Sequence, residues 1–380
     1  MTSGPATTPR VLLVGPNPFE ARTSMWLFVE CLAAGLPRHG CAPAVLKPRF
    51  PNLGRLGRRR TTKVILRLVL EAAQLRRAAK AADVIHVCDH ASAFHLLARR
   101  LRHRPKVVTC HDLFFIAASV KRPEDSLATE AWWQRRILRG ISAADRIACI
   151  SAETQAALLE IVPALAGASP PTIILPNGLY QKFVPRPAAE VAAGLRALDP
   201  RLEPGRYVLH VGGSYERKNR RGVAQAFAAF GPAHGLRLVL AGEPPNALLR
   251  STITDTGIAP YLTLADHPDA ATLGLLYQGA FALLFPSRNE GFGLPPVEAQ
   301  TLGCPVVASD IGPHRLNLAD SALLAGPEDH ATLAAHLASL LDESVRAALV
   351  ARGFANSQRF AMDTMLDRYA ALYRELLPRG

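Results

Sequence analysis

Two glutamates, Glu290 and Glu298, flank a run with two glycines and two prolines in the segment NEGFGLPPVEAQTLGCPVVAS, residues 289–309. Glycines let a backbone approach a ligand closely and direct its amides at an anion. Prolines suit the first turn of a helix, and the dipole of that helix favours an anion at its start. The pattern therefore predicts a phosphate seat at 291–294, bordered by carboxylates that accept hydroxyl hydrogen bonds. For an isolated pair, a simpler interpretation is that Glu290 caps the helix and Glu298 faces water.

Two cations follow an apolar run in a second segment, VGGSYERKN at 211–219. Arg217 offers a planar fork of donors and Lys218 a compact charge, and both suit an anion. If the turn faces the seat at 291–294, the two cations add positive charge to that seat. The alternative is a solvated basic turn, because Arg220 and Arg221 stand directly beside it.

A lone histidine, His111, follows the apolar run KVVTC at 106–110. At the end of a strand that faces a cleft, it would contact a substrate or stabilise charge at a reacting centre. A lone histidine is more often a satisfied structural residue. Its neighbour Asp112 either orients the imidazole or caps the next turn.

Short apolar runs alternate with segments of helical period along most of the chain, which is the βαβ pattern of parallel sheets covered on both faces. The expected strands are 10–15, 42–47, 83–88, 106–110, 146–150, 172–176, 207–213, 236–242, 261–265, 281–285, 305–309 and 321–326. Helices are expected at 24–37 and 128–143, and the Pro- and Ala-rich segment 184–205 is expected to be a linker that contains one short helix. The fold class is α/β, with two doubly wound domains at 1–185 and 200–358. Ligands of such sheets bind beyond the carboxyl ends of the strands, here in the cleft between the domains.

The chain of 380 residues carries a formal net charge of +13, which favours an anionic partner. Its basic segment Lys47–Arg67 contains no acid and few aromatic residues, so nucleic acid is not expected. A helix at 61–80 is expected to pack its apolar face on a sheet, with a polar stripe at Lys63, Arg67, Glu71, Gln74 and Arg77. The preceding loop LGRLGRRR is left to attract anionic lipid or a phosphate-bearing acceptor. The apolar run before Gly15 is too short for a signal peptide, and no run is long enough to span a membrane. The protein is therefore expected to be cytoplasmic, with peripheral attachment to the inner face of the cell membrane as a further expectation.

The motifs together resemble those of the retaining glycosyltransferases of family 4, which have the GT-B fold. The shared features are the two glutamates with seven residues between them, the segment from Gly303 to Ser309, VGGSYERKN, LPNGL at 175–179, TCHDLF at 109–114 and ISAET at 150–154. They occur in order with family-like spacing. The sequence departs from the family in the loop GPNPFEARTS at 15–24, which lacks the usual glycine pair. In such a fold the C-terminal helix, here about 360–380, returns to the first domain.

The resemblance implies a role for each candidate residue. Glu290 lies near the donor sugar and acts with His111 as a catalytic residue, while Glu298 accepts hydrogen bonds from the ribose. The diphosphate is held by Arg217 and Lys218, and by backbone amides at Gly291, Phe292, Gly293 and Leu294. The base lies in the loop that contains Asp266 and His267.

The reaction implied is transfer of a sugar from a nucleotide diphosphate donor to a glycan or lipid-linked acceptor. The segment GFGLPPVEA resembles the corresponding segment of mannosyl- and rhamnosyl-type transferases of bacterial surface polysaccharide assembly. GDP-mannose is therefore the first expectation for the donor. No Asp-x-Asp occurs in the chain, and no metal or cofactor is expected. A nicotinamide-linked enzyme is disfavoured because no GxGxxG follows a strand. A nucleotide-sugar 2-epimerase of the same fold and a non-catalytic basic binding protein remain alternatives.

Overall fold

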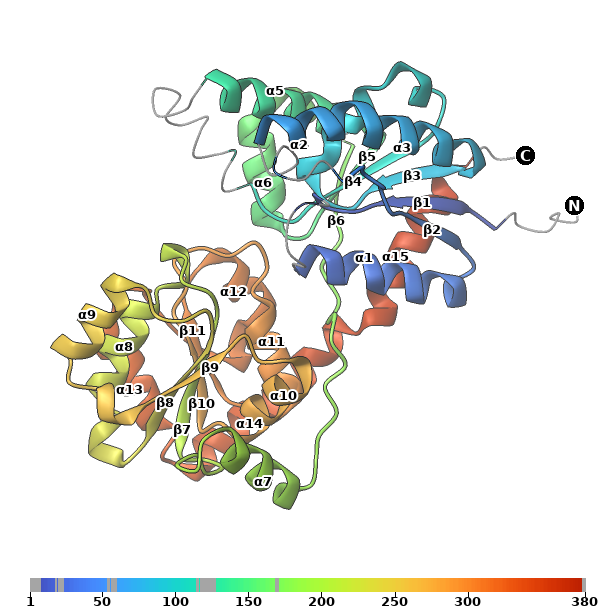
Figure 1. Cartoon of the computed structure of the whole chain (residues 1–380). Coiled ribbons are helices and arrows are strands. Elements are labelled where there is room, and N and C mark those ends of the chain that lie inside the picture. Colours follow the sequence, from blue (N-terminus) through green and yellow to red (C-terminus); the bar gives the residue numbers. More distant parts are fainter. Residues whose placement is uncertain are drawn as a thin grey trace, which may run out of the picture. The chain divides into compact units, whose positions relative to one another are not determined.

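The computed structural model describes residues 8–17, 19, 24–52, 55, 60–113, 116, 128–167 and 171–377. They form two compact units, one of Met1–Tyr180 with Met362–Gly380 and the other of Gln181–Ala361. Each unit contains one six-stranded parallel sheet with helices on both faces (Figure 1). The expected class, two doubly wound α/β domains, is therefore confirmed.

The sheet of the first unit has the order β2-β1-β3-β4-β5-β6. Its strands are β1 (Arg10–Val14), β2 (Ala42–Leu46), β3 (Val84–Val87), β4 (Lys106–Cys110), β5 (Arg146–Cys149) and β6 (Thr172–Ile174). Successive residues of a strand point to opposite faces, so both faces of a covered strand must be apolar. Leu12 and Val14 pack on one face with helices α3, α5 and α6, whereas Val11 and Leu13 pack on the other with α1 and α15. These helices are α1 (Ser24–Gly35), α3 (Ala72–Ala78), α5 (Ala128–Ser142), α6 (Ala152–Ile161) and α15 (Met362–Glu375).

The C-terminal helix α15 is tied to this sheet by a buried chain of hydrogen bonds. His86 on β3 bonds Tyr373 at 2.7 Å through Nδ1 and Thr109 on β4 at 2.8 Å through Nε2. The hydroxyls of Thr109 and Tyr369 lie 2.9 Å apart. Burial lowers the pKa of His86 to about 3, so the imidazole stays neutral in this apolar setting. The helix expected at about 360–380 thus belongs structurally to the first unit.

The sheet of the second unit has the order β12-β11-β10-β7-β8-β9. Its strands are β7 (Tyr207–Val211), β8 (Arg237–Gly242), β9 (Leu262–Asp266), β10 (Ala282–Phe285), β11 (Val306–Ser309) and β12 (Leu323–Ala325). Apolar side chains of α8 (Arg220–Ala228), α9 (Ala247–Asp255) and α13 (His330–Ser339) cover one face. The remaining helices are α7 (Ala188–Leu198), α10 (Ala270–Gly279), α11 (Leu294–Thr301), α12 (Gly312–Leu318) and α14 (Glu343–Ser357).

The segment 184–205, expected to be a linker with one short helix, contains helix α7 of the second unit. Helix α7 buries Val191 and Leu195, four residues apart on one helical face. Leu195 and Val191 lie against the site of Gly279 at the end of α10, so this helix is fixed by packing. The change of unit occurs earlier in the chain, between Tyr180 and Gln181.

The prediction that the apolar face of the helix at 61–80 packs inward and its polar stripe stays outside is wrong for part of that stripe. The segment forms α2 (Arg60–Leu66), the π-helical turn η3 (Arg67–Glu71) and α3. Arg67 and Glu71 point inward and are buried, with Arg67 Nε 2.9 Å from Glu71 Oε2 and Nη2 2.8 Å from Ser92 Oγ. Ile65 and Val69 are exposed instead. Most of the preceding basic loop, 53–54 and 56–59, lies outside the described residues.

Candidate functional site

Three predicted site residues meet in the second unit, where both cations contact one carboxylate. Arg217 and Lys218 lie in the short turn η9 (Glu216–Lys218), which follows β7. Glu290 follows β10, the neighbour of β7 in the sheet. Its Oε2 lies 3.1 Å from Arg217 Nη1, and its Oε1 lies 2.7 Å from Lys218 Nζ. The carboxyl ends of adjacent parallel strands thus bring together residues that are more than seventy positions apart.

Glu290 is buried, with 6% of its surface exposed. Burial by itself would raise the pKa of this carboxyl, but the charges of Lys218 and Arg217 outweigh burial and hold the pKa below its usual value. Glu290 is therefore ionised at neutral pH. In this state it is an anionic partner of the two cations that were predicted to bind a diphosphate.

The glycine loop before α11 has the backbone geometry of an anion seat. Gly293 has φ of 83° and is the N-terminal cap of α11, so the cap residue has no side chain to bond the amides of the first turn. A Cβ at this position would lie 2.9 Å from His314 Nε2, so glycine is required for both reasons. Pro295 and Pro296 carry no N–H group. The donors left for an anion are therefore the amides of the loop and of Leu294.

His314 and Asn317 on α12 pack against this loop. Asn317 Nδ2 donates to the carbonyl of Phe292 at 2.8 Å, and the Phe292 ring is buried. His314 Nδ1 donates to the carbonyl of Ser309 at 2.9 Å. Burial lowers the pKa of His314, so the ring is neutral and Nε2 is an acceptor beside Gly293.

Glu298 lies one turn inside α11 and is buried with Tyr277 of α10. The Tyr277 hydroxyl donates to Glu298 Oε2 at 2.9 Å. Burial raises the pKa of Glu298 to about 7, although Tyr277 and Lys218 act in the opposite direction. This carboxyl differs from Glu290 in lacking a cation at hydrogen-bond distance among its described contacts. It changes charge near neutral pH.

Asp266 and His267 lie at the end of β9, where the base was expected. Both side chains are exposed, and His267 Nδ1 lies 2.5 Å from Asp266 Oδ1. His267 has φ of 44°, in the left-handed region, and its amide donates to the carbonyl of Gly242 at 3.2 Å. The two residues form a pair of their own at the carboxyl edge of the sheet.

His111 belongs to the first unit, at the end of β4. Its Nε2 donates to the carbonyl of Cys88 at 2.9 Å, and its ring packs edge-on against Phe28. Burial lowers its pKa, so the ring is neutral with the proton on Nε2. The atom that is left to accept a hydrogen bond from a hydroxyl is Nδ1.

Comparison with known proteins places the chain in a family. The model described as "Glycosyl transferases group 1" matches residues 199–354, and the model described as "Glycosyltransferase Family 4" matches residues 27–179. The chain belongs to glycosyltransferase family 4. The first match lies wholly within the second structural unit and the second match wholly within the first, so the family and its GT-B fold account for both units.

This glycosyltransferase is 28% identical to the O-antigen chain mannosyltransferase B of Escherichia coli over 321 residues, 81% of each chain. It is 31% identical to the O-antigen chain mannosyltransferase RfbU of Salmonella typhimurium over 128 residues, 33% of this chain and 36% of that protein. Among solved structures, Anabaena Alr3699/HepE in complex with UDP and glucose has the same fold. It superposes with a TM-score of 0.72 at 18% identity, covering 96% of this chain and 99% of that one.

Motifs in the glycosyltransferase sequence did not indicate the residues that support its site. Tyr277 and His314 lie in α10 and α12, and the buried His210 on β7 bonds the carbonyl of Leu284 at 3.0 Å through Nδ1. The one available signal was that two of them, His210 and His314, are polar residues within or just beyond an apolar strand. Over the residues that the structure describes, no group of three or more His, Cys, Asp or Glu side chains is arranged to hold a metal ion. Independence of metal stays a prediction.

Proposed function

We propose that this glycosyltransferase moves mannose from GDP-mannose to a glycan or lipid-linked acceptor, with retention of anomeric configuration and without metal, in the synthesis of a bacterial surface polysaccharide. The names of two relatives, both O-antigen chain mannosyltransferases, support the sugar and the pathway class. The observation that carries the proposal is the pairing of Arg217 and Lys218 with Glu290 beside the start of α11.

The geometry suits stabilisation of a leaving diphosphate. As the bond between the sugar and the phosphate breaks, negative charge grows on the phosphate oxygens. Arg217 and Lys218 are placed to take that charge, and the amides from Gly291 to Leu294 add a helix start without a side-chain cap. Glu290 forms an ion pair with each cation, at 3.1 Å and 2.7 Å, and so holds both in place.

Glu298 and His111 would orient the donor. An ionised Glu298 accepts hydrogen bonds from ribose hydroxyls, and neutral His111 accepts one from a sugar hydroxyl through Nδ1. In the proposed donor complex, Asp266 and His267 border the base. These roles follow the family resemblance together with the burial and tautomer of each group.

A donor screen tests the proposal. GDP and GDP-mannose are expected to raise the midpoint of thermal unfolding more than UDP, UDP-glucose or GMP, because they bind the folded state. Incubation with GDP-mannose and an acceptor polysaccharide fraction, with a chelator present, should form product whose anomeric configuration by NMR matches the donor. A larger shift with UDP-sugars would contradict the mannose assignment. Epimer formed from donor alone would favour the 2-epimerase, and no nucleotide-dependent shift would favour a binding protein.

We also propose that the enzyme works at an anionic membrane surface, through the outward face of α2, η3 and α3. This face carries Ile65, Val69, Arg76, Arg77 and Lys80, all exposed, with apolar residues at one end and cations at the other. Such a face can lie in the headgroup region of a bilayer. Of the described helices, none combines the length and the apolar character needed to cross a membrane.

The double variant Ile65→Ser/Val69→Ser should reduce sedimentation with vesicles of phosphatidylglycerol at least fivefold, since about 1 kcal/mol is lost per buried side chain. Addition of about 0.5 M salt should weaken binding of the wild-type protein as the charges are screened. The variant Leu341→Ser, at an exposed apolar residue of the second unit, is the matched control and should bind as the wild type. Sedimentation that is unaffected by lipid charge and by the double variant would refute this proposal.

A further inference from the structure

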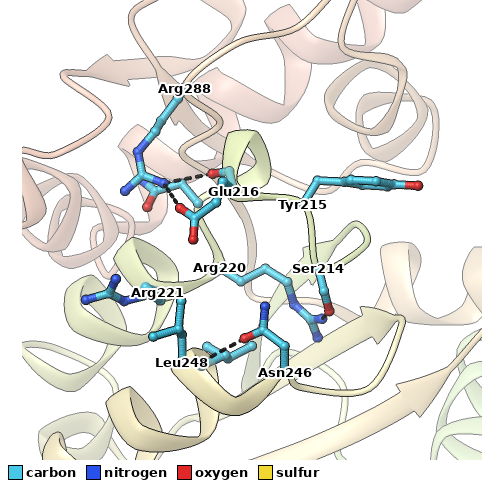
Figure 2. Close-up of a pocket in the computed structure, with 10 residues that line it drawn as sticks. Ser214, Tyr215, Glu216, Arg220, Arg221, Asn246, Leu248 and Arg288 are labelled. Atoms are coloured by element: carbon cyan, nitrogen blue, oxygen red, sulfur yellow. Dashed lines mark hydrogen bonds and ion pairs between the residues drawn. The ribbon is translucent and has the colours of Figure 1, made fainter. Parts of the chain in front are cut away.

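A polar pocket lies in the second unit, beside the turn that carries Arg217 and Lys218. It opens to solvent. Its walls come from the loop before α8, the first turns of α8 and α9, and one residue after β10 (Figure 2). The residues used below are Ser214, Tyr215, Arg220, Arg221, Asn246 and Arg288.

Arg220 is the main feature of this pocket. Only 4% of its surface is exposed. Its Nη1 donates to Ser214 Oγ at 3.0 Å and to the carbonyl of Glu243 at 2.7 Å. Its Nε and Nη2 are buried and have no hydrogen-bond partner in the described structure. Since a guanidinium cannot give up its proton at ordinary pH, two of its donor groups lack the partners that a buried cation needs.

The surroundings of Arg220 favour an anion as the missing partner. Three guanidinium groups line the pocket, from Arg220, Arg221 and Arg288. Arg288 is already paired with Glu216 at 3.3 Å and with Glu328 at 2.5 Å. The carboxylate of Glu243 also acts on Arg220, but it forms no hydrogen bond to Nε or Nη2 of that guanidinium in the described structure. The N-terminal ends of α8 and α9 both border the pocket, so two helix dipoles add positive potential there. Asn246 Oδ1 caps α9 at Leu249, and Figure 2 shows its amide nitrogen turned toward Arg220.

The pocket is separate from the site around Glu290. Within η9, Glu216 lines the pocket, whereas Arg217 and Lys218 contact Glu290. Figure 2 shows Glu216 facing Arg288, whose guanidinium also donates to the Glu216 carbonyl at 2.7 Å. The amide of Arg288 in turn donates to the carbonyl of Arg217 at 2.7 Å. One short turn therefore has the candidate donor site on one side and this pocket on the other.

We infer that this pocket binds a phosphate group, as the free ion or as a small phosphate ester, with Arg220 and Arg221 as its principal ligands. A phosphate offers enough acceptor oxygens to satisfy Nε and Nη2 of Arg220 together, in the fork geometry that arginine favours. The rim residues Tyr215 and Leu248 are more than half exposed and would contact the organic part of an ester. This site takes its own anion and is distinct from the diphosphate subsite of the donor.

Titration calorimetry with inorganic phosphate tests the inference, in the presence of saturating GDP so that the donor site is filled. The wild-type protein should bind one phosphate with a Kd in the millimolar range or tighter, and Arg220→Gln should weaken binding at least tenfold. Arg221→Gln, at a more exposed position, should weaken it about threefold and serves if Arg220→Gln does not fold. The control Arg196→Gln removes the same charge from the exposed surface of α7 and should bind as the wild type.

Two further measurements are needed. One distinguishes phosphate binding in this pocket from binding at the donor site, and the other distinguishes the free phosphate ion from a phosphate ester as the ligand. Lys218→Ala should keep phosphate binding within about twofold, because Lys218 faces Glu290. Phenyl phosphate that binds more than threefold tighter than inorganic phosphate, with the difference lost in Tyr215→Ala, identifies an ester site. Equal affinity identifies the free ion. Absence of phosphate binding with GDP bound, or binding that survives in both arginine variants but disappears in Lys218→Ala, would overturn the assignment.

Discussion

Replacement of Glu290 by glutamine is expected to lower turnover by about a hundredfold, the scale found when one preorganised electrostatic group is lost. Glutamine keeps the size of the side chain but not the charge that holds Arg217 Nη1 and Lys218 Nζ. Nucleotide diphosphate binding should not weaken in this variant, since Glu290 is a competing anion for the same cations. Lys218→Ala should differ by lowering turnover at least tenfold and weakening diphosphate binding as well. Steady-state kinetics and calorimetry with GDP separate the two effects.

The matched control is Glu375→Gln on α15. Glu375 pairs with Arg146 at 2.6 Å, but this ion pair is largely exposed and lies in the other unit. Its turnover should stay within twofold of the wild-type value. Because Glu290 and Lys218 are in contact, the double variant should fall by less than the product of the two single effects. Normal turnover in Glu290→Gln, in a protein with an intact thermal transition, would remove this carboxylate from the mechanism.

The strands could be predicted because burial on both faces of a sheet requires a recognisable run of apolar residues. A parallel strand covered on both faces needs apolar residues at nearly every position, as in RVLLV of β1 and VVAS of β11. All twelve expected runs contain a strand, with ends that differ by a few residues. The short helix expected within 184–205 is α7. Its composition did not show that Val191 and Leu195 pack this helix into the second unit.

The helix at 61–80 shows that hydrophobic periodicity alone does not determine which face of a helix is buried. A helical pattern tells which residues share a face, but not which face points inward. Here the decisive partners are Ser92 and His95, which lie outside the window and surround Arg67 and Glu71 in the core. A buried ion pair with these extra partners is satisfied, so the polar face could turn inward and leave Ile65 and Val69 outside.

For the candidate site too, the sequence indicates the residues of a local motif but not the partners that they contact from distant segments. Arg217, Lys218, Glu290 and Glu298 were predicted as site residues because their spacing resembles a known motif. The contact of Glu298 with Tyr277 depends on the packing of α10 against α11, and the contact of Arg217 with Glu290 depends on the adjacency of β7 and β10. Such neighbours follow from strand order, which no single segment of the sequence specifies.

The pH dependence of stability should report the unusual state of Glu298. Its pKa is about 7 in the folded protein and near the ordinary glutamate value of 4.5 when unfolded. Below pH 4.5 both states are protonated, and the stabilising effect of burying the neutral carboxyl is complete. As the pH rises from 4.5 to 7 the unfolded state ionises first, so the free energy of unfolding falls. At about 1.4 kcal/mol per pH unit, the fall amounts to roughly 3 kcal/mol.

Denaturant unfolding of the wild-type protein and of Glu298→Gln, measured from pH 4.5 to 8, isolates this group from the buried histidines that titrate in both. The wild-type protein should lose roughly 3 kcal/mol relative to the variant across this range. Tyr277→Phe removes the hydroxyl that stabilises the carboxylate, so its decline should extend to higher pH. If Glu298 holds the ribose, GDP binding should also strengthen between pH 6 and 8 in the wild-type protein, relative to Glu298→Gln, because the ionised carboxylate is the better acceptor. A difference in stability that does not vary with pH would show that Glu298 is ionised throughout, despite its burial.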